Sequence, residues 1–520
     1  MTRAAPYLAP TARPGEPLAG ISVLPSRSTP DHGSLGSGDG DRPHVVVVGG
    51  GIAGLAAAYR LTRLDPPVAV TLIDAEQRLG GKILTEHLDG FTIEGGPDSF
   101  LSIKPRGVGL CTELGLSALL QGTTPRPHRA FVRRGDRLHE LPEGLTGLVP
   151  TRLQPILRSC LLSPWGKVRF AADAVLPARR DEADESLAHF VRRRLGREVY
   201  ERLVEPLMAG IYAGDGEQLS LAATFPRLRE GERVHGGLIR GVVASRTVPS
   251  PVDGAPALPP FVAPSAGMET LVDALIRELR GAAVRICLGS PVHAVERDTS
   301  PQMDHLDRYR VELATGEAIG ADGVVVAVPA FVAAELLAGF DAELATALGA
   351  IPHASSAIVS LAYPEGDIPR VLDAHGYVIP RAEARAALAC TWTSAKWRGR
   401  APDGMALIRV FVGRFGQEQL LAGDDDALVA IARAELRETL GIAAPPSLTR
   451  VHRWPDGMPQ YTMGHLDRLV TIERSLAHDP AVALAGAAYR GVGIPDCIES
   501  GEAAAVRVHA WLSQWASSSR

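Results

Sequence analysis

A glycine-rich turn between a buried strand and a helix constrains this chain more than any other feature. Val45–Val48 is a β-branched run that predicts a buried strand, and the Ala-rich segment after the turn predicts a helix. Gly49, Gly51 and Gly54 match the dinucleotide-binding fingerprint: the first permits the tight turn, the second lets a pyrophosphate approach, and the third lets the helix pack closely. The helix N-terminus would then offer N–H groups and partial positive charge to phosphates.

An acidic residue at the end of the next predicted strand supports this interpretation. The segment 68–74 predicts a second parallel strand and ends in Asp74, 20 residues after Gly54. A carboxylate at this place accepts hydrogen bonds from the adenosine ribose hydroxyls. The alternative is a glycine-rich turn that binds nothing, and the paired acid makes it the weaker hypothesis. The sequence therefore predicts a dinucleotide site.

Two more glycine-rich segments decide which dinucleotide is expected. They are 77–82, with the pattern Arg-x-Gly-Gly-Lys, and 94–100, with Gly-Gly-Pro-Asp-Ser. With them, the run from 45 to 100 resembles the flavin amine oxidase and protoporphyrinogen oxidase superfamily. The resemblance implies that the first segment lies along the FAD pyrophosphate and the second beside the flavin ring, whereas NAD-only dehydrogenases lack the second glycine pair. In this part of the chain it predicts FAD contacts from Gly49, Gly50, Gly51, Ile52, Ala53, Gly54, Asp74, Ala75, Arg78, Lys82, Gly96, Pro97, Asp98 and Ser99.

The C-terminal region predicts a matching flavin element. Residues 481–486 predict a short buried strand, a Gly-rich turn follows, and residues 497–512 predict a helix with Pro495 at its start. The N–H groups of Val492, Gly493 and Ile494 would then face the flavin pyrimidine edge, where negative charge develops on reduction. An ordinary helix cap is the alternative. The resemblance adds two further FAD contacts, Val292 and Trp454.

A series of ordered motifs points to one branch of the superfamily. Between residues 43 and 515 the chain is similar to the porphyrinogen oxidases of the Gram-positive type. The motifs are Gly96–Leu101, Glu205–Asp215, Leu219–Leu221, Thr224–Pro226, Cys390–Thr393 with Lys396 and Trp397, Met458–Tyr461, and Gly491–Cys497.

This resemblance implies an oxidase. It implies that FAD, held non-covalently, oxidises coproporphyrinogen III to coproporphyrin III in three two-electron steps of heme biosynthesis, and that dioxygen is reduced to three hydrogen peroxides. A protoporphyrinogen IX oxidase is the first alternative, and an amine oxidase or carotenoid desaturase is a more distant one. A flavoprotein that uses its flavin only structurally is a different class, and intact flavin segments at both ends of the chain argue against it.

The rarity of lysine draws attention to particular side chains. Only four of the 54 basic residues are lysines, and three of the four fall in predicted flavin or substrate segments. Lys82 is expected to neutralise FAD phosphate, and Lys104 is the main candidate for binding a substrate propionate, with a solvated surface charge as the alternative. The other predicted substrate contacts are Tyr212, Trp392 and Lys396. No dedicated catalytic base is predicted, because the flavin would carry the hydride.

Charge and cysteine content limit the partners. The net charge of −5 argues against nucleic acid. The five cysteines form no Cys-x-x-Cys pair, which predicts reduced thiols in a cytoplasmic protein, no metal site and no redox dithiol. Cys497 is expected to be a buried thiol rather than a covalent flavin link. Dioxygen and a porphyrinogen are the expected partners, and docking of a coproporphyrin ferrochelatase is left open.

The predicted fold class is α/β. A discontinuous, doubly wound (Rossmann-like) FAD domain is expected to be combined with a mixed-sheet substrate domain and a mainly helical domain. Apolar residues at steps of three and four between 187 and 207 predict helix. The expected segments are a disordered tail at 1–42, FAD-binding parts at 43–110, 226–330 and 476–515, substrate-domain parts at 111–139 and 331–475, and the helical domain at 140–225.

Two further segments, residues 243–266 and 150–180, stand out by their composition. Residues 243–266 contain six prolines and predict a mobile surface loop. Residues 150–180 mix Leu, Trp165 and Phe170 with basic residues. They are expected to line a substrate channel, with peripheral membrane contact as the alternative, and no segment is long and apolar enough to predict a membrane span.

Overall fold

The computed structural model describes residues 42–124, 129–142, 145–146, 149–150, 153–181, 183–245, 258–298 and 308–518. The tail predicted at 1–42 lies outside this part of the chain except for Arg42, and so does the middle of the proline-rich segment. The α/β fold class is confirmed.

A five-stranded parallel sheet forms the centre of the dinucleotide-binding domain. β1 is the middle strand, and Val45–Val48 pair with residues 70–73 on one side and 323–326 on the other. The strands come from three distant parts of the chain, so the domain is discontinuous. In sheet order they are β12 (Arg285–Cys287), β2 (Ala69–Ile73), β1 (His44–Val48), β16 (Gly323–Val326) and β22 (Val482–Leu484).

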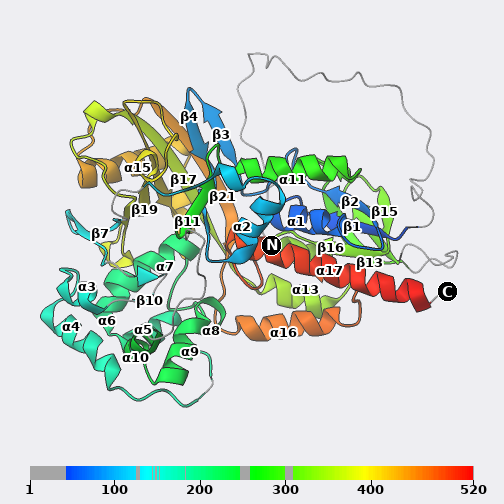
Figure 1. Cartoon of the computed structure of the whole chain (residues 1–520), viewed down its shortest axis with the longest axis horizontal. Coiled ribbons are helices and arrows are strands. Elements are labelled where there is room, and N and C mark those ends of the chain that lie inside the picture. The colour runs from blue at the N-terminus through cyan, green and yellow to red at the C-terminus, as the bar shows by residue number, and fades with distance from the viewer. Residues whose placement is uncertain are drawn as a thin grey trace. The chain divides into compact units, whose positions relative to one another are not determined.

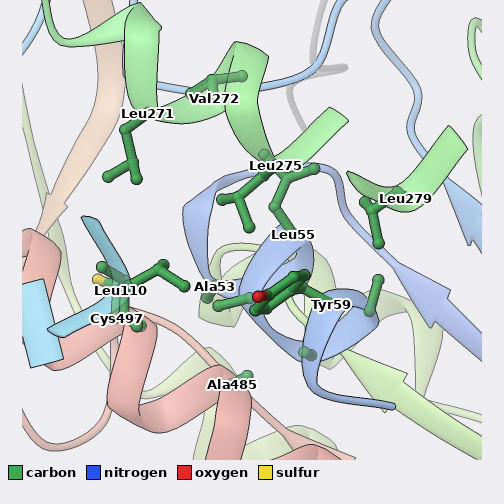
Figure 2. Packing of buried hydrophobic residues seen from close by; sticks show 14 of the residues in the cluster. Ala53, Leu55, Tyr59, Leu110, Leu271, Val272, Leu275, Leu279, Ala485 and Cys497 are labelled. Carbon is green, nitrogen blue, oxygen red and sulfur yellow. The ribbon is translucent and has the colours of Figure 1, made fainter. Parts of the chain in front are cut away.

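Three helices cover one face of this sheet. α1 (Ile52–Leu61) lies between α11 (Glu269–Gly281) and α17 (Ile494–Ser518), as Figure 1 shows. A Cβ at Gly501 of α17 would lie only 2.0 Å from the carbonyl oxygen of Ala53, so glycine is required for the two helices to approach. Figure 2 shows the core that results, with Leu55 and Tyr59 of α1 near Leu275 of α11. This packing places the N-terminal turns of α1 and α17 at the same edge of the sheet.

The other face is covered by a small antiparallel sheet and three helices. This second core includes Val46 and Val324 from the parallel sheet and Leu344 and Leu476 from the helices. Residues 330–349 therefore pack with the dinucleotide-binding domain, although the expected boundary of the substrate domain was residue 331. The elements are β13 (Val292–Arg297), β14 (Tyr309–Leu313), β15 (Ala318–Ala321), α12 (Ala330–Leu336), α13 (Ala342–Gly349) and α16 (His465–Leu476).

A seven-stranded mixed sheet forms the second large unit. The helix α15 (Asp425–Leu440) packs on this sheet, and Trp392 and Leu436 lie in the core between them. In sheet order the strands are β21 (Leu448–Pro459), β17 (His353–Pro364), β20 (Met405–Val412), β19 (Ala387–Trp392), β18 (Gly376–Val378), β7 (Phe131–Arg134) and β8 (Arg137–Glu140).

The helical unit differs from the expected continuous pattern. Gly196 has φ +97° and separates α5 (Leu187–Arg194) from α6 (Arg197–Val199), so the apolar periodicity spans a break. The proline-rich segment predicted as a loop also begins inside helix α10 (Leu238–Ser245) and includes strand β11 (Phe261–Pro264), which pairs with two short strands. The remaining helices of this unit are α3 (Leu153–Arg158), α4 (Pro164–Ala171), α7 (Glu205–Tyr212), α8 (Leu221–Thr224), α9 (Pro226–His235) and α10 (Leu238–Ser245).

Candidate flavin site

The glycine turn after β1 has the geometry that its sequence predicts. Gly49 has φ +104°, and a Cβ at Gly54 would lie 1.8 Å from the Gly49 carbonyl oxygen, so both positions require glycine. Gly51 precedes the first turn of α1, and no heavy atom lies within 4 Å of the position of its missing Cβ. The backbone at the N-terminus of α1 is therefore open to a close ligand. Gly50, Ile52 and Ala53 belong to the same turn.

Asp74 faces this turn from the end of β2. Its carboxylate accepts hydrogen bonds from the backbone N–H of Gly50 at 2.5 Å and of Glu76 at 2.7 Å. The N–H of Ser290 donates to the Asp74 carbonyl oxygen at 3.0 Å and brings the segment before Val292 to the same strand end. Asp74, Ala75 and Val292, all predicted to contact FAD, thus lie in neighbouring segments.

The loop at 78–82 packs directly on the glycine turn. The N–H of Gly80 donates to the Gly50 carbonyl oxygen at 2.8 Å. The Arg78 guanidinium donates to the carbonyl oxygen of Ile83 at 3.1 Å and to that of Gly81, so it holds its own loop. The predicted contact of Arg78 with phosphate stays a prediction. Part of the Lys82 side chain is exposed to solvent. The protein that surrounds the rest of it lowers the pKa of its ammonium group.

The second glycine segment is fixed by side chains from the seven-stranded sheet. Trp454 Nε1 donates to the Gly95 carbonyl oxygen at 2.7 Å, and Arg409 donates to that of Gly96. A Cβ at Gly96 would lie 1.9 Å from the Lys82 carbonyl oxygen, so this segment runs against the Lys82 loop. Gly96, Pro97, Asp98 and Ser99 are thereby held between the two domains.

Asp98 is the centre of a charge cluster that is largely, but not fully, buried. Lys396 Nζ lies 3.0 Å, Trp397 Nε1 3.3 Å and Arg409 3.5 Å from its carboxylate, and Ser99 donates to it at 2.7 Å. Burial alone would raise the pKa of Asp98, but Lys396 and Arg409 outweigh burial and hold this pKa well below its ordinary value. Lys396, predicted to contact substrate, is therefore paired with a residue predicted to contact FAD.

A second buried pair lies beside this cluster. The guanidinium of Arg400 is 3.2 Å from the carboxylate of Glu94, and both side chains are fully buried. Burial raises the pKa of Glu94, and Arg400 opposes this only in part. The sequence analysis did not identify Glu94, Arg400 or Arg409. Arg409 had a signal, because it is a lone charge in the apolar run 405–412.

The turn before α17 is tied to the segment that follows β5 (Phe100–Leu101). Lys104 Nζ lies 2.6 Å from both carboxylate oxygens of Asp496, and the Gly493 N–H donates to the same carboxylate at 3.1 Å. The N–H of Gly493, predicted with those of Val492 and Ile494 to face the flavin, is thus bonded within the protein. Lys104 is 43% exposed although it is ion-paired, so one side remains accessible to a ligand. Asp496 was missed in the sequence analysis.

The two aromatic substrate candidates lie in different surroundings. Tyr212 lies at the end of α7, with its ring edge-on to Tyr461 at 6.1 Å. Trp392 is fully buried between the large sheet and α15, where it packs near Phe131 at 6.0 Å. Nothing in its surroundings supports a substrate contact for Trp392, and that role stays a prediction.

These groups fit a flavin dinucleotide. An open helix N-terminus at Gly51, a ribose-accepting carboxylate at Asp74 and an accessible lysine at Lys82 supply donors and acceptors of the kind that a pyrophosphate and a ribose need. In the described part of the chain, no cluster of three or more His, Cys, Asp or Glu residues could hold a metal ion.

Comparison with known families identifies the class of cofactor. The model of the flavin-containing amine oxidoreductase family matches residues 52–509. The chain belongs to this family. Members of the flavin-containing amine oxidoreductases use flavin, so the cofactor of this chain is a flavin.

Curated relatives in this family are similar over nearly the whole chain. Coproporphyrinogen III oxidase of Bacillus subtilis is 38% identical over 89% of this chain and 97% of its own length. The enzyme of the same name from Staphylococcus aureus is 34% identical over 90% of this chain and 99% of its own length. Human protoporphyrinogen oxidase is 32% identical over 89% of this chain and 98% of its own. The resemblance to the porphyrinogen oxidases is thereby confirmed.

Solved structures show the same fold. A crystal structure from Exiguobacterium sp. 255-15 has a TM-score of 0.78 and 33% identity, and covers 91% of this chain and 100% of its own. Reduced UDP-galactopyranose mutase has a TM-score of 0.66 and 16% identity over 90% of this chain and 96% of its own, which supports the fold alone. Among the described helices of this oxidoreductase, none is long and apolar enough to cross a membrane.

Proposed function

We propose that this protein is a coproporphyrinogen III oxidase that holds FAD non-covalently and reduces dioxygen. The observation that carries the proposal is the 38% identity to the Bacillus subtilis enzyme of that name over 97% of its length. The arrangement of Asp74, Lys82 and the open turn at Gly51 supports FAD. The buried, shielded thiol of Cys497 supports a non-covalent cofactor, because burial raises the pKa of this thiol to about 12.

The protein's own residues bind and orient the substrate and the cofactor, and they exclude water from the site. FAD, when bound, supplies an acceptor for the two electrons of each step and passes them to dioxygen. The oxidation converts one porphyrinogen and three dioxygens to one porphyrin and three hydrogen peroxides. Lys104 is proposed to contact a propionate, since its ammonium is accessible on one side. Tyr212 is proposed to form an apolar wall, and burial raises the pKa of its hydroxyl well above the ordinary value, so it stays neutral.

Charge in the site supports an anionic substrate. The net charge of the chain is −5, so attraction for a tetracarboxylate has to be local. Lys396 is 15% exposed and lies beside Asp98. Arg409 is buried and lies beside the same carboxylate, so this cluster has two cations for one carboxylate. We assign the catalytic role to the cofactor and none to a dedicated protein base.

Protoporphyrinogen IX oxidase is the second candidate. It is favoured by the 32% identity to the human enzyme of that name. The two substrates differ at two propionate-versus-vinyl positions, so charged contacts discriminate between them. An amine oxidase or carotenoid desaturase is less favoured, because the named curated relatives at 32–38% identity are porphyrinogen oxidases.

Location and partners follow from the same proposal. We place the enzyme in the cytoplasm, with a coproporphyrin ferrochelatase as the consumer of its product. The helical unit exposes Leu157, Trp165, Val168 and Val175, and Trp165 is 82% exposed. Such a surface beside Arg158 and Lys167 supports at most peripheral contact with an anionic membrane. Flotation with anionic vesicles tests it, and recovery of the protein only in the unbound fraction would exclude this contact.

Stoichiometry tests the proposed reaction. Purified protein loaded with FAD is mixed with coproporphyrinogen III in air, and porphyrin fluorescence and hydrogen peroxide are measured together. The proposal predicts three peroxides per porphyrin and no porphyrin above the spontaneous rate without FAD. Flavin-independent porphyrin formation, or a flavin that coproporphyrinogen III does not reduce under nitrogen, would overturn it.

A further inference from the structure

A buried tyrosine connects the turn before α17 with the helical unit. Tyr461 is 1% exposed and lies just after β21. Its hydroxyl donates to the Ala487 carbonyl oxygen at 2.6 Å and accepts from the Gly491 N–H at 2.8 Å. One hydroxyl therefore satisfies two backbone groups of the segment that leads into the 491–494 turn.

The ring of Tyr461 is held as firmly as its hydroxyl. It stacks on the buried imidazole of His465, with ring centroids 4.1 Å apart and planes 11° apart. The imidazole Nε2 lies 2.9 Å from the Tyr489 carbonyl oxygen, so the neighbouring side chain contacts the same backbone segment. Tyr461 and His465 together fix three points between residues 487 and 491.

The backbone around Tyr461 reaches the helical unit. The N–H of Ser220 donates to the Tyr461 carbonyl oxygen at 2.8 Å, and the N–H of Met463 donates to that of Gln218 at 2.9 Å. The side-chain amide of Gln460 donates to the carbonyl oxygen of Tyr212 at 2.8 Å, and this glutamine is fully buried. The segment 460–463 thus lies between the residue proposed to line the substrate site and the turn proposed to face the flavin.

We propose that Tyr461 is a positioning residue that sets the 491–494 turn against the flavin and holds it in register with Tyr212. This inference rests on the proposed function only in so far as the turn contacts FAD. A buried N–H without a partner is costly, so loss of the Tyr461 hydroxyl displaces the Gly491 backbone rather than leaving it in place. The turn then presents the N–H groups of Val492 and Ile494 less well to the cofactor.

Tyr461→Phe tests the proposal, and Tyr489→Phe is a matched control. Tyr489 is buried in the same region, but its hydroxyl has no hydrogen-bond partner among the described residues. Both substitutions remove one buried hydroxyl and keep the ring, so both proteins are expected to fold. FAD titration followed by flavin fluorescence measures the dissociation constant, and the visible flavin spectrum reports the surroundings of the ring.

Tyr461→Phe is expected to weaken FAD binding about tenfold and to shift the flavin spectrum, whereas Tyr489→Phe is expected to stay within twofold of wild type. With FAD saturating, Tyr461→Phe is expected to lower kcat more than it raises KM. A reduced stability of Tyr461→Phe with unchanged FAD affinity and spectrum would overturn the proposal. Equal effects of the two variants would overturn it as well.

These readouts separate the two proposals. The titration uses FAD and no porphyrinogen, so it gives the same answer whichever porphyrinogen the enzyme oxidises. Failure of the wild type to oxidise any porphyrinogen would remove the proposed function and leave the Tyr461 result standing. A normal oxidation of coproporphyrinogen III with no effect of Tyr461→Phe on flavin would remove only the positioning role.

Discussion

The ammonium group of Lys104 lies 2.6 Å from both carboxylate oxygens of Asp496, which is 392 positions later in the chain. This pair joins the start of α2 (Pro105–Glu113) to the first turn of α17. Because Asp496 also accepts from the Gly493 N–H, the lysine supports the turn proposed to face the flavin. Lys104 therefore serves the fold of the site as well as the proposed contact with substrate.

Lys104→Met is expected to raise KM for coproporphyrinogen III about tenfold, and to affect protoporphyrinogen IX less. The tetracarboxylate substrate loses a cation, and tenfold corresponds to about 1.4 kcal/mol. Steady-state kinetics with both substrates measures the difference. Asp496→Asn is the control, because it frees Lys104 but weakens the turn. Equal KM values for wild type and Lys104→Met would show that Lys104 serves only the turn.

Gly51→Ala is expected to leave the unfolding temperature of the flavin-free protein within about 2 °C of wild type and to weaken FAD binding at least tenfold. The new Cβ meets no protein atom within 4 Å, so any effect on affinity arises from the ligand. Gly281→Ala, at the end of α11, also meets no atom within 4 Å and should change neither quantity. Calorimetry measures the unfolding temperature, and FAD titration measures the affinity. Unchanged affinity in Gly51→Ala would place the pyrophosphate elsewhere.

Arg409→Met is expected to lower the free energy of unfolding by about 3–5 kcal/mol, because it leaves the largely buried Asp98 without one of its cations and the Gly96 carbonyl oxygen without a donor. Urea denaturation measures this change. The exposed pair Arg63–Glu278 provides the comparison, and Arg63→Met should cost less than about 1 kcal/mol. If the two substitutions cost the same, the buried cluster has no special role in stability.

Acid should destabilise the protein through His353. Burial lowers the pKa of this imidazole from 6.5 to about 4, and its Nδ1 lies 3.0 Å from the Ile351 carbonyl oxygen. The unfolded chain takes up the proton near pH 6.5 but the folded chain only near pH 4, so stability falls as pH decreases between these values and is unaffected above about pH 7. Between pH 7 and pH 5 the loss is on the order of 2 kcal/mol.

The variant His353→Gln removes this titration and should flatten the decline. Unfolding free energies at pH 7 and pH 5 are compared for wild type, His353→Gln and the exposed control His478→Gln. The control should follow the wild type. A decline of the same size in His353→Gln would assign the acid sensitivity to other groups, such as His465, whose pKa burial also lowers.

Much of the fold could be predicted because its signals are local. The strand–turn–helix at 45–59 and Asp74 depend on residues close in sequence, and the α/β class follows from them. The interruption at Gly196 was not predicted, because the apolar periodicity continues across it. The missed signal was the glycine itself within the helical pattern, at a position where the chain takes a positive φ.

The electrostatics of the site could not be predicted in the same way. Asp98 meets Arg409 because β20, a strand of the other domain, packs against the second glycine segment, and no spacing in the sequence encodes this contact. The scarcity of lysine drew attention to Lys104 and Lys396, but it gave no sign that both are ion-paired. Their partners, Asp496 and Asp98, depend on long-range packing.

The ratio of kcat/KM for coproporphyrinogen III to that for protoporphyrinogen IX tests the central claim most directly. It is measured with the FAD-loaded protein in air, by porphyrin fluorescence and hydrogen peroxide. We predict a preference of at least tenfold for coproporphyrinogen III, which is about 1.4 kcal/mol of transition-state stabilisation. A preference for protoporphyrinogen IX, or no flavin-dependent oxidation of either substrate, would contradict the proposed function.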